Sequence, residues 1–117
     1  NCYTVSGGQG LITNVEICGV YIDIYGPSYM NTAFNPYTFT AVSTDVVDTD
    51  VYVDIYWYGE LGSVITSSIV IYNGTTNNSD INAYYFGPGE NFSYANVYIS
   101  PPNSTTQDYF VGQIFSL

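Results

Sequence analysis

The sequence predicts an all-β domain, and three observations support this prediction. Runs of alternating apolar and polar residues recur along the 117-residue chain. Clusters of Gly, Pro and Asn separate these runs at intervals of about 8–12 residues. No segment combines a helical apolar period with caps, and strong helix formers are scarce, with one Met and no Lys or Arg. We therefore expect an immunoglobulin-like antiparallel β-sandwich of about seven or eight strands, with an eight-stranded barrel or jelly roll as the alternative.

Residues 51–58 give the clearest strand. Its two faces differ in character, because Val51, Val53, Ile55 and Trp57 alternate with Tyr52, Asp54, Tyr56 and Tyr58. Such alternation is typical of a strand with one buried face and one amphipathic outer face.

A second alternating run extends from Val15 to Ile24, and its apolar parity changes near Cys18-Gly19. We expect one long strand with a β-bulge at this point. The remaining strands are expected at residues 37–42, 63–72, 81–86, 92–99 and 109–117, with a short one from Tyr3 to Val5. Turn sequences such as Gly59-Glu60-Leu61-Gly62 and Gly87-Pro88-Gly89 separate them.

The chain length fits one domain with one core. We divide it into residues 1–10, an N-terminal segment that ends in the Gly-rich hinge Gly7-Gly8-Gln9-Gly10, and residues 11–117, the sandwich. No apolar run is long enough to predict a transmembrane helix, and no basic region followed by an apolar stretch predicts a signal peptide. We interpret residue 1 as the mature N-terminus of an exported protein.

The charge balance excludes several classes of function. Lys plus Arg is 0, His is 0 and Asp plus Glu is 10, so the formal net charge is −10. Without cations the chain has no counter-charge for phosphate, so we expect no nucleic acid partner and no P-loop. The absence of His and Lys excludes His-dependent nucleophiles and Schiff bases. Anionic membrane surfaces would repel the chain, and we expect no membrane insertion.

Three pressures could remove every basic residue. Acid is the first, because near pH 2 most carboxylates are protonated and a chain without bases escapes the positive self-repulsion that unfolds ordinary proteins. Calcium, which consumes carboxylates, is the second, and an accident of lineage is the third.

Four Asn-x-Ser/Thr sequons lie in expected turns or at expected strand ends. Their acceptors are Asn73, Asn77, Asn91 and Asn103. A chain rich in Asn, Ser and Thr produces some sequons by accident, but four within the last 45 residues favour N-linked glycans.

The two cysteines, Cys2 and Cys18, predict one disulfide in an exported protein, either within a subunit or between subunits. A bond within the subunit would close a loop of about 15 residues and contribute roughly 3 kcal/mol on a chain-entropy estimate.

The acidic residues Asp45, Asp48, Asp50 and Asp54 are the best metal candidates, because alternating carboxylates are typical of calcium loops. The chain lacks the Asp-x-Asp-x-Asp-Gly pattern, so a solvated loop is the favoured interpretation and we expect no cofactor other than glycans. We also expect no enzyme: no Asp-Thr-Gly pair is present, and the spacing of Glu16, Glu60 and Glu90 singles out no catalytic pair.

The tyrosine-rich outer faces allow two interpretations. Tyr stacks on sugars, as in a lectin-like module, and Tyr also packs subunit on subunit as a sheet-forming surface that does not depend on ionisation.

A Lys/Arg-free β chain rich in Tyr, Asn, Ser and Thr, with four sequons, resembles the exported surface proteins of thermoacidophilic archaea. In particular it resembles the subunits of their threads, filaments outside the type IV class whose β-sandwich heads link head to tail by donor-strand complementation. Segments such as Ile69-Val70-Ile71-Tyr72-Asn73-Gly74-Thr75 and Gly87-Pro88-Gly89-Glu90-Asn91 are also similar to generic immunoglobulin-type adhesion domains.

The resemblance implies a structural subunit of an extracellular, glycosylated, acid-tolerant filament whose partner is another copy of itself. The donor would be the N-terminal segment with Tyr3 and Val5, or the C-terminal segment 109–117, and we favour the N-terminal one. A monomeric secreted carbohydrate-binding or adhesion domain with a sugar or cell-surface target is one alternative. A virion surface protein is the other.

Overall fold

The structure is a computed structural model that describes residues 3–8, 11–17, 19–26, 29–30, 37–43, 51–71, 76–81, 86–100 and 108–116. The elements named in this part of the chain are all strands: β1 (Tyr3–Gly8), β2 (Leu11–Ile17), β3 (Val20–Tyr25), β4 (Tyr29–Met30), β5 (Tyr37–Ser43), β6 (Val51–Gly59), β7 (Val64–Ile71), β8 (Thr76–Ile81), β9 (Phe92–Ile99) and β10 (Tyr109–Ser116). None of the described residues belongs to a helix that could cross a membrane.

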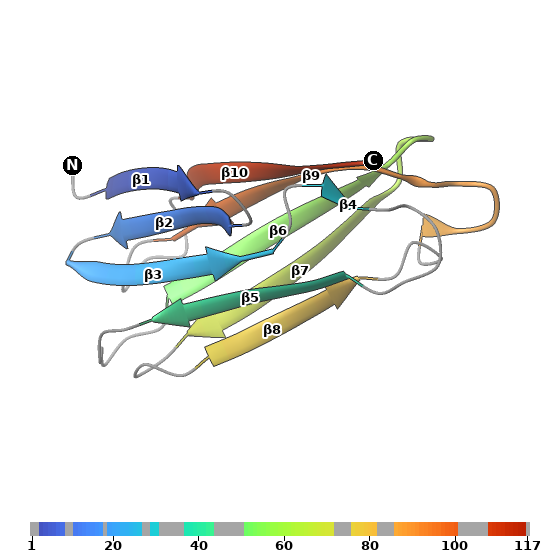
Figure 1. The fold of residues 1–117 in the computed structure, drawn as a ribbon. Coiled ribbons are helices and arrows are strands. Elements are labelled where there is room, and N and C mark those ends of the chain that lie inside the picture. Colours follow the sequence, from blue (N-terminus) through green and yellow to red (C-terminus); the bar gives the residue numbers. More distant parts are fainter. Residues whose placement is uncertain are drawn as a thin grey trace.

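The strands form the predicted β-sandwich. One sheet has the order β1-β2-β3-β5-β8 and the other the order β4-β10-β9-β6-β7, and the two lie face to face in Figure 1. All described pairings are antiparallel except that of the two-residue β4, which runs parallel to β10. The chain visits the second sheet briefly at β4, between β3 and β5, and then changes sheet after β5, after β7 and after β8. The last three crossings are the Greek-key connectivity of immunoglobulin-like sandwiches. The fold class predicted from alternation and turn spacing is confirmed.

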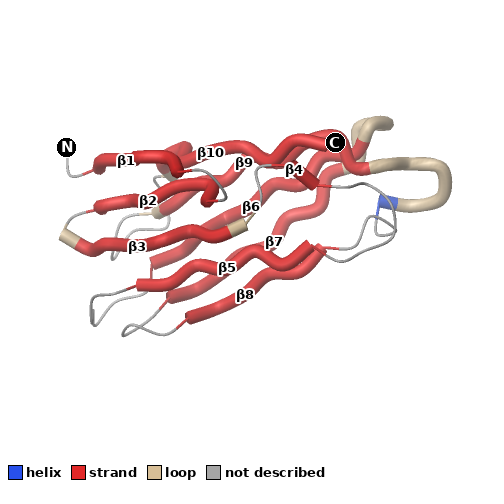
Figure 2. Tube along the Cα trace, in the orientation of Figure 1, coloured by secondary structure: helices blue, strands red, loops and turns tan. Residues whose placement is uncertain are grey.

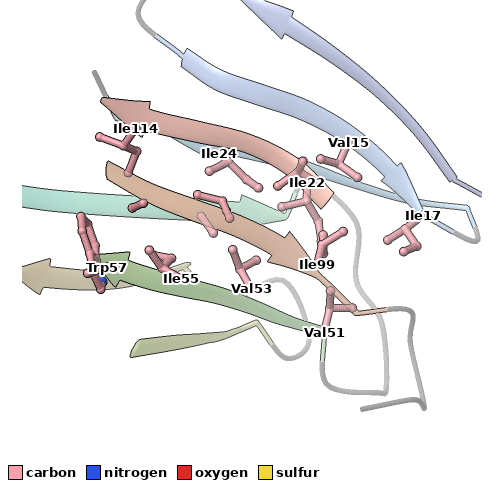
Figure 3. Packing of buried hydrophobic residues seen from close by; sticks show 14 of the residues in the cluster. Val15, Ile17, Ile22, Ile24, Val51, Val53, Ile55, Trp57, Ile99 and Ile114 are labelled. Atoms are coloured by element: carbon pink, nitrogen blue, oxygen red, sulfur yellow. The ribbon is translucent and has the colours of Figure 1, made fainter. Parts of the chain in front are cut away.

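The core is the layer between the two sheets. Val15, Ile17, Ile22 and Ile24 of the first sheet face Val51, Val53, Ile55, Trp57, Ile99 and Ile114 of the second in Figure 3. Along β6 every second residue is buried, as the alternating pattern predicts. Burial of these apolar side chains stabilises the fold at roughly 25 cal/mol per Å² removed from water.

The change of parity near residue 18 marks a hairpin, so the prediction of one long bulged strand from Val15 to Ile24 is wrong. β2 ends at Ile17 and β3 begins at Val20, and these two residues pair across the turn. Gly19 has φ +83°, a conformation that favours glycine and is typical of tight hairpin turns. A two-residue turn reverses the chain, and it shifts the apolar parity just as a bulge would.

The strand expected at residues 81–86 falls mostly on residues 82–85, which lie outside the described residues, and the structure shows a strand that the sequence did not predict, β8, at Thr76–Ile81. This segment, Thr-Asn-Asn-Ser-Asp-Ile, lacks apolar alternation. Among the described strands β8 pairs only with β5, so its extended state comes from one ladder rather than from its own propensity. Phe86, drawn blue in Figure 2, has 3₁₀ conformation and a buried side chain.

The N-terminal segment is part of the sandwich. β1 pairs with β2 from Tyr3 opposite Ile17 to Gly8 opposite Leu11, so the Gly-rich stretch expected to be a hinge connects two strands of a hairpin. Tyr3 also ties this edge to the other sheet, because its ring stacks on Tyr109 with centroids 4.7 Å apart. Its hydroxyl donates a hydrogen bond to the carbonyl oxygen of Phe110.

Candidate functional site

The outer face of the β4-β10-β9-β6-β7 sheet carries a continuous group of aromatic side chains, which we call the tyrosine face. β6 alternates buried residues with partly exposed ones, and β9 and β10 place their own outward residues beside them. Register determines the neighbours: Tyr58 lies opposite Tyr94, and Asp54 lies opposite Tyr98. The aromatic members of the tyrosine face are Tyr56, Tyr58, Tyr94, Tyr98, Phe110 and Phe115.

Five of these six rings contact another member of the tyrosine face, and the sixth, Phe115, contacts Tyr29 of β4. Tyr58 and Tyr94 stack with centroids 4.7 Å apart and planes 14° from parallel. Tyr56 meets Tyr98 edge to face at 5.6 Å, and Tyr98 meets Phe110 in the same way at 5.8 Å. Such pairs contribute about 0.5–1.5 kcal/mol beyond area burial, so the face presents an ordered surface.

An open groove of about 190 Å³ lies on this face, lined among the described residues by Tyr56, Tyr58, Tyr98 and Asp108. Burial, the negative charge of Asp54 and a hydrogen bond with Asp54 together raise the pKa of Asp108. Burial comes first among the causes that raise the pKa of Tyr56, followed by the charges of Asp54 and Asp108. The groove is thus a negatively charged site with aromatic walls.

Polar side chains on the same face are paired with one another. The Nε2 of Gln113 donates a hydrogen bond to the Oδ1 of Asn96 at 2.9 Å. The hydroxyl of Ser68 donates to the Oδ1 of Asp54 at 2.5 Å. These bonds hold the polar groups between the rings in fixed orientations.

The opposite outer face has a second groove, of about 180 Å³. It is lined among the described residues by Thr4, Asn14, Val15, Glu16, Tyr21 and Asp23. Asp23 accepts hydrogen bonds from the Nδ2 of Asn14 at 2.6 Å and from the hydroxyl of Tyr25 at 3.4 Å. Asn14 and Asp23 of this groove already bind each other and no aromatic cluster among the described residues lines it, so the tyrosine face is the stronger candidate site.

Glu90 is a buried carboxylate that holds the β6–β7 turn, and sequence reasoning missed this role. Its Oε2 accepts hydrogen bonds from the backbone N–H of Leu61 at 2.8 Å and of Ser63 at 3.0 Å. The Ser63 side chain also bonds the carboxylate, and these bonds hold the pKa of Glu90 below its ordinary value although burial opposes them. Only 8% of Glu90 is exposed.

Gly59 is required for this arrangement. A Cβ on Gly59 would lie 2.4 Å from the Oε2 of Glu90 and 2.8 Å from the Cδ1 of Phe86. The backbone of Gly59 therefore allows the carboxylate to approach the turn. In the sequence, only the turn signal Gly59-Glu60-Leu61-Gly62 marks this region. It does not indicate that Glu90 binds the turn.

The structure places few of the sequence-predicted site residues in described positions. Asn91 is exposed, in the loop before β9, and its carbonyl accepts the N–H of Glu60 at 2.9 Å. Asn77 lies in β8 opposite Ala41, and Tyr3 and Val5 lie in β1. Among the described residues no group of three or more His, Cys, Asp or Glu side chains could hold a metal ion. The remaining predicted residues lie outside the described part of the chain: Cys2, Cys18, Asp45, Asp48, Asp50, Asn73 and Asn103.

No protein-family model, curated protein or solved structure matches the chain. The fold is therefore assigned from strand order and register. The candidate site is assigned from the geometry and charge of the tyrosine face.

Proposed function

We propose that the chain is a structural subunit of an extracellular, glycosylated filament that polymerises by addition of a strand to a sheet edge. The observation that carries this proposal is the composition of β7. β7 is eight residues long and reads Val-Ile-Thr-Ser-Ser-Ile-Val-Ile, without a charge, a Pro or a Gly.

β7 is an edge strand in the described sheet. It pairs with β6 along its whole length without a register shift, so no bulge twists the edge away. The next strand, β8, belongs to the opposite sheet and packs beside β7 without pairing with it. Natural monomers protect such edges with charges, Pro or bulges, and an unprotected long edge is a template for a strand from another chain.

The N-terminal strand β1 is the favoured donor. In the single chain it already occupies an edge, where it pairs with β2 alone among the described strands. Donation therefore requires β1 to leave β2 and to break the contact of Tyr3 with Tyr109. The donated strand would extend a sheet rather than fill a gap, and the head-to-tail contact would produce an open polymer.

The surface chemistry agrees with an exposed extracellular role. Asn91, the sequon residue whose side chain the structure describes, is exposed and can accept a glycan without rearrangement. The absence of Lys, Arg and His leaves the protein without side-chain cations at any pH, so acid cannot drive subunits apart by positive repulsion.

The experiment is negative-stain microscopy and light scattering of the purified chain between pH 2 and pH 7. We expect polymers from the wild-type chain and from Leu61→Lys, whose side chain is exposed in the β6–β7 turn. We expect none from Thr66→Lys, which places a charge on the exposed outer side of β7. A wild-type chain that stays monomeric throughout, or a Thr66→Lys chain that polymerises normally, would contradict the proposal.

The donor is tested separately with Val5→Pro, which removes an N–H from β1. Loss of polymers in this variant supports β1 as the donor, whereas normal polymers show that another segment is donated.

A further inference from the structure

We propose that the groove on the tyrosine face binds the guanidinium group of an arginine side chain on a partner protein. This inference does not depend on the filament proposal. It assigns a binding site and the chemical class of the group that the site takes.

The first step of the argument is charge. Asp108 lines the groove and is hydrogen-bonded to Asp54, so two carboxyl groups meet at one end of it. The chain has no Lys, Arg or His, and its own copies therefore cannot supply a side-chain cation. The complementary charge has to come from a different molecule, which distinguishes this site from the self-assembly edge.

The second step is the chemistry of the walls. Tyr56, Tyr58 and Tyr98 line the groove, and a cation over the face of a Tyr ring is attracted by the ring quadrupole. Tyr56 and Tyr98 stand 88° apart, so they present surfaces in two directions around the same space. A planar cation can stack on a ring face and at the same time donate hydrogen bonds to the neighbouring carboxylate.

The third step separates arginine from other cations. The groove is open to solvent and does not form the enclosing cage that a methylated ammonium requires. A guanidinium is planar, stacks on an aromatic ring and donates two parallel hydrogen bonds to a carboxylate. A lysine ammonium is a strongly hydrated point charge that gains less from the ring.

Proton linkage gives the site a pH dependence. The groups that face the bound cation are Asp54 and Tyr56 and Tyr58 from β6, Tyr98 from β9 and Asp108 before β10. A cation favours the ionised form of Asp108, so binding should release a proton and affinity should rise as pH rises through the titration of Asp108.

The test is an NMR titration of the full chain with N-acetyl-L-arginine amide, which carries a guanidinium and no other charge. We expect a dissociation constant of about millimolar, as for a small ligand on an open site. The shifts should map to Tyr56, Tyr58, Tyr98 and Asp108. N-acetyl-L-citrulline amide has nearly the same shape without the charge and should not bind.

Variants test the assignment to these residues. Asp108→Asn removes the charge at an exposed position and should weaken arginine binding about fivefold. Tyr98→Leu removes one ring and should weaken it about two- to fivefold. Glu60→Gln removes a charge from the exposed β6–β7 turn and serves as the matched control with wild-type affinity.

Three results would overturn the inference. The first is equal binding of the arginine and citrulline amides, which would show that charge is not recognised. The second is wild-type affinity in both Asp108→Asn and Tyr98→Leu. The third is binding of a neutral sugar such as cellobiose in the groove while the arginine amide fails to bind there.

Discussion

Two carboxyl groups in this chain, Glu90 and Asp108, lack a cationic side chain to pair with, and their surroundings shift their pKa values in opposite directions. Glu90 lies under the β6–β7 turn and accepts hydrogen bonds from the N–H groups of Leu61 and Ser63. Asp108 lies on the tyrosine face beside a second carboxyl, Asp54, with which it forms a hydrogen bond. Neither has a cation to pair with, because the chain contains none.

The contrast shows what replaces the salt bridge in a chain without bases. Donors from Ser63 and Leu61 stabilise the ionised form and lower the pKa of Glu90. Asp108 is exposed as a residue, but partial desolvation of its carboxyl and the like charge of Asp54 stabilise the protonated form and raise the pKa of Asp108. One carboxyl belongs to the fold and the other to a surface site, and the two respond to acid with opposite signs.

The most damaging change should be Gly59→Ala. Its Cβ would meet the Glu90 carboxylate and the Phe86 ring, both at less than 3 Å. Phe86 cannot retreat freely because its ring packs on Phe92, with centroids 6.3 Å apart. We expect a loss of about 2–3 kcal/mol in the free energy of unfolding, measured by chemical denaturation. Gly62→Ala is not an equivalent control, because Gly62 has φ +98° and would be strained by any side chain.

Unchanged stability of Gly59→Ala would show that the carboxylate can move out of the turn at no cost. The claim that Gly59 is required for the Glu90 arrangement would then be wrong.

The next largest effect should be the loss of acid sensitivity in Glu90→Gln. A group whose pKa is lower in the folded state stabilises the fold above its unfolded pKa, here an ordinary value of 4.5. That stability is lost as pH falls through the folded value. Thermal melts of the wild-type chain should therefore decline below about pH 4.5, and those of Glu90→Gln should start lower and decline less.

Glu60→Gln is the matched control for this profile, because Glu60 is exposed in the same turn. Its pH profile should follow that of the wild type. A Glu90→Gln profile parallel to the wild type from pH 2 to pH 7 would contradict the assigned role.

Tyr3→Phe should have a smaller effect on stability. It tests whether the hydrogen bond from the Tyr3 hydroxyl to the backbone of Phe110 stabilises the fold, as backbone donors do for Glu90. The change removes only the hydroxyl that donates to the Phe110 carbonyl and keeps the ring stacked on Tyr109. We expect a loss of about 1 kcal/mol by denaturation. A neutral result would mean that water replaces the hydroxyl at this partly exposed edge.

The smallest effect should come from Asp108→Asn. A carboxyl whose pKa is raised on folding stabilises the fold below its unfolded pKa, ordinarily 3.8, and this contribution is lost as pH rises through the folded value. Replacing the charge should thus leave stability at neutral pH unchanged or raise it by less than about 0.5 kcal/mol, since Asp108 is exposed. A marked loss of stability at neutral pH would show that the ionised carboxylate has a structural partner.

These profiles bear on the interpretation of the composition as acid tolerance. A chain without side-chain cations escapes positive repulsion at pH 2, but it still loses the hydrogen bonds that depend on ionised Glu90. Protonation of Asp108 acts in the opposite direction, because a carboxyl whose pKa is raised on folding adds to the free energy of unfolding at low pH. The melting temperature at pH 2 reports which contribution is larger.

The sequence predicted the strands whose burial alternates and missed those that depend on their neighbours. β6 and β9 follow their apolar pattern, because each lies between two strands and one face of each is buried. β8 has no such pattern and becomes a strand by pairing with β5. The turn between Ile17 and Val20 cannot be distinguished from a bulge by apolar alternation, since both change the parity in the same way.

The candidate site was only partly predictable for the same reason. The outward tyrosines of β6 follow directly from alternation, so an amphipathic face was expected. Tyr98 and Asp108 join them because β9 pairs with β6 and the start of β10 pairs with β9, and a single sequence does not reveal these pairings. The approach of Glu90 to Gly59 is a contact between two turns and leaves almost no trace in local composition.

Trp57 gives the molecule an internal optical reporter. It is the only tryptophan of the chain, it is fully buried, and its Nε1 donates to the hydroxyl of Ser67 at 2.8 Å. Its ring packs edge to face on Phe92, the residue that connects the core to the Glu90 loop. Tryptophan emission excited at the red edge of absorption, where the 14 tyrosines do not absorb, therefore follows the centre of the sandwich alone. A shift of that emission to longer wavelength would time the opening of the core without any added label.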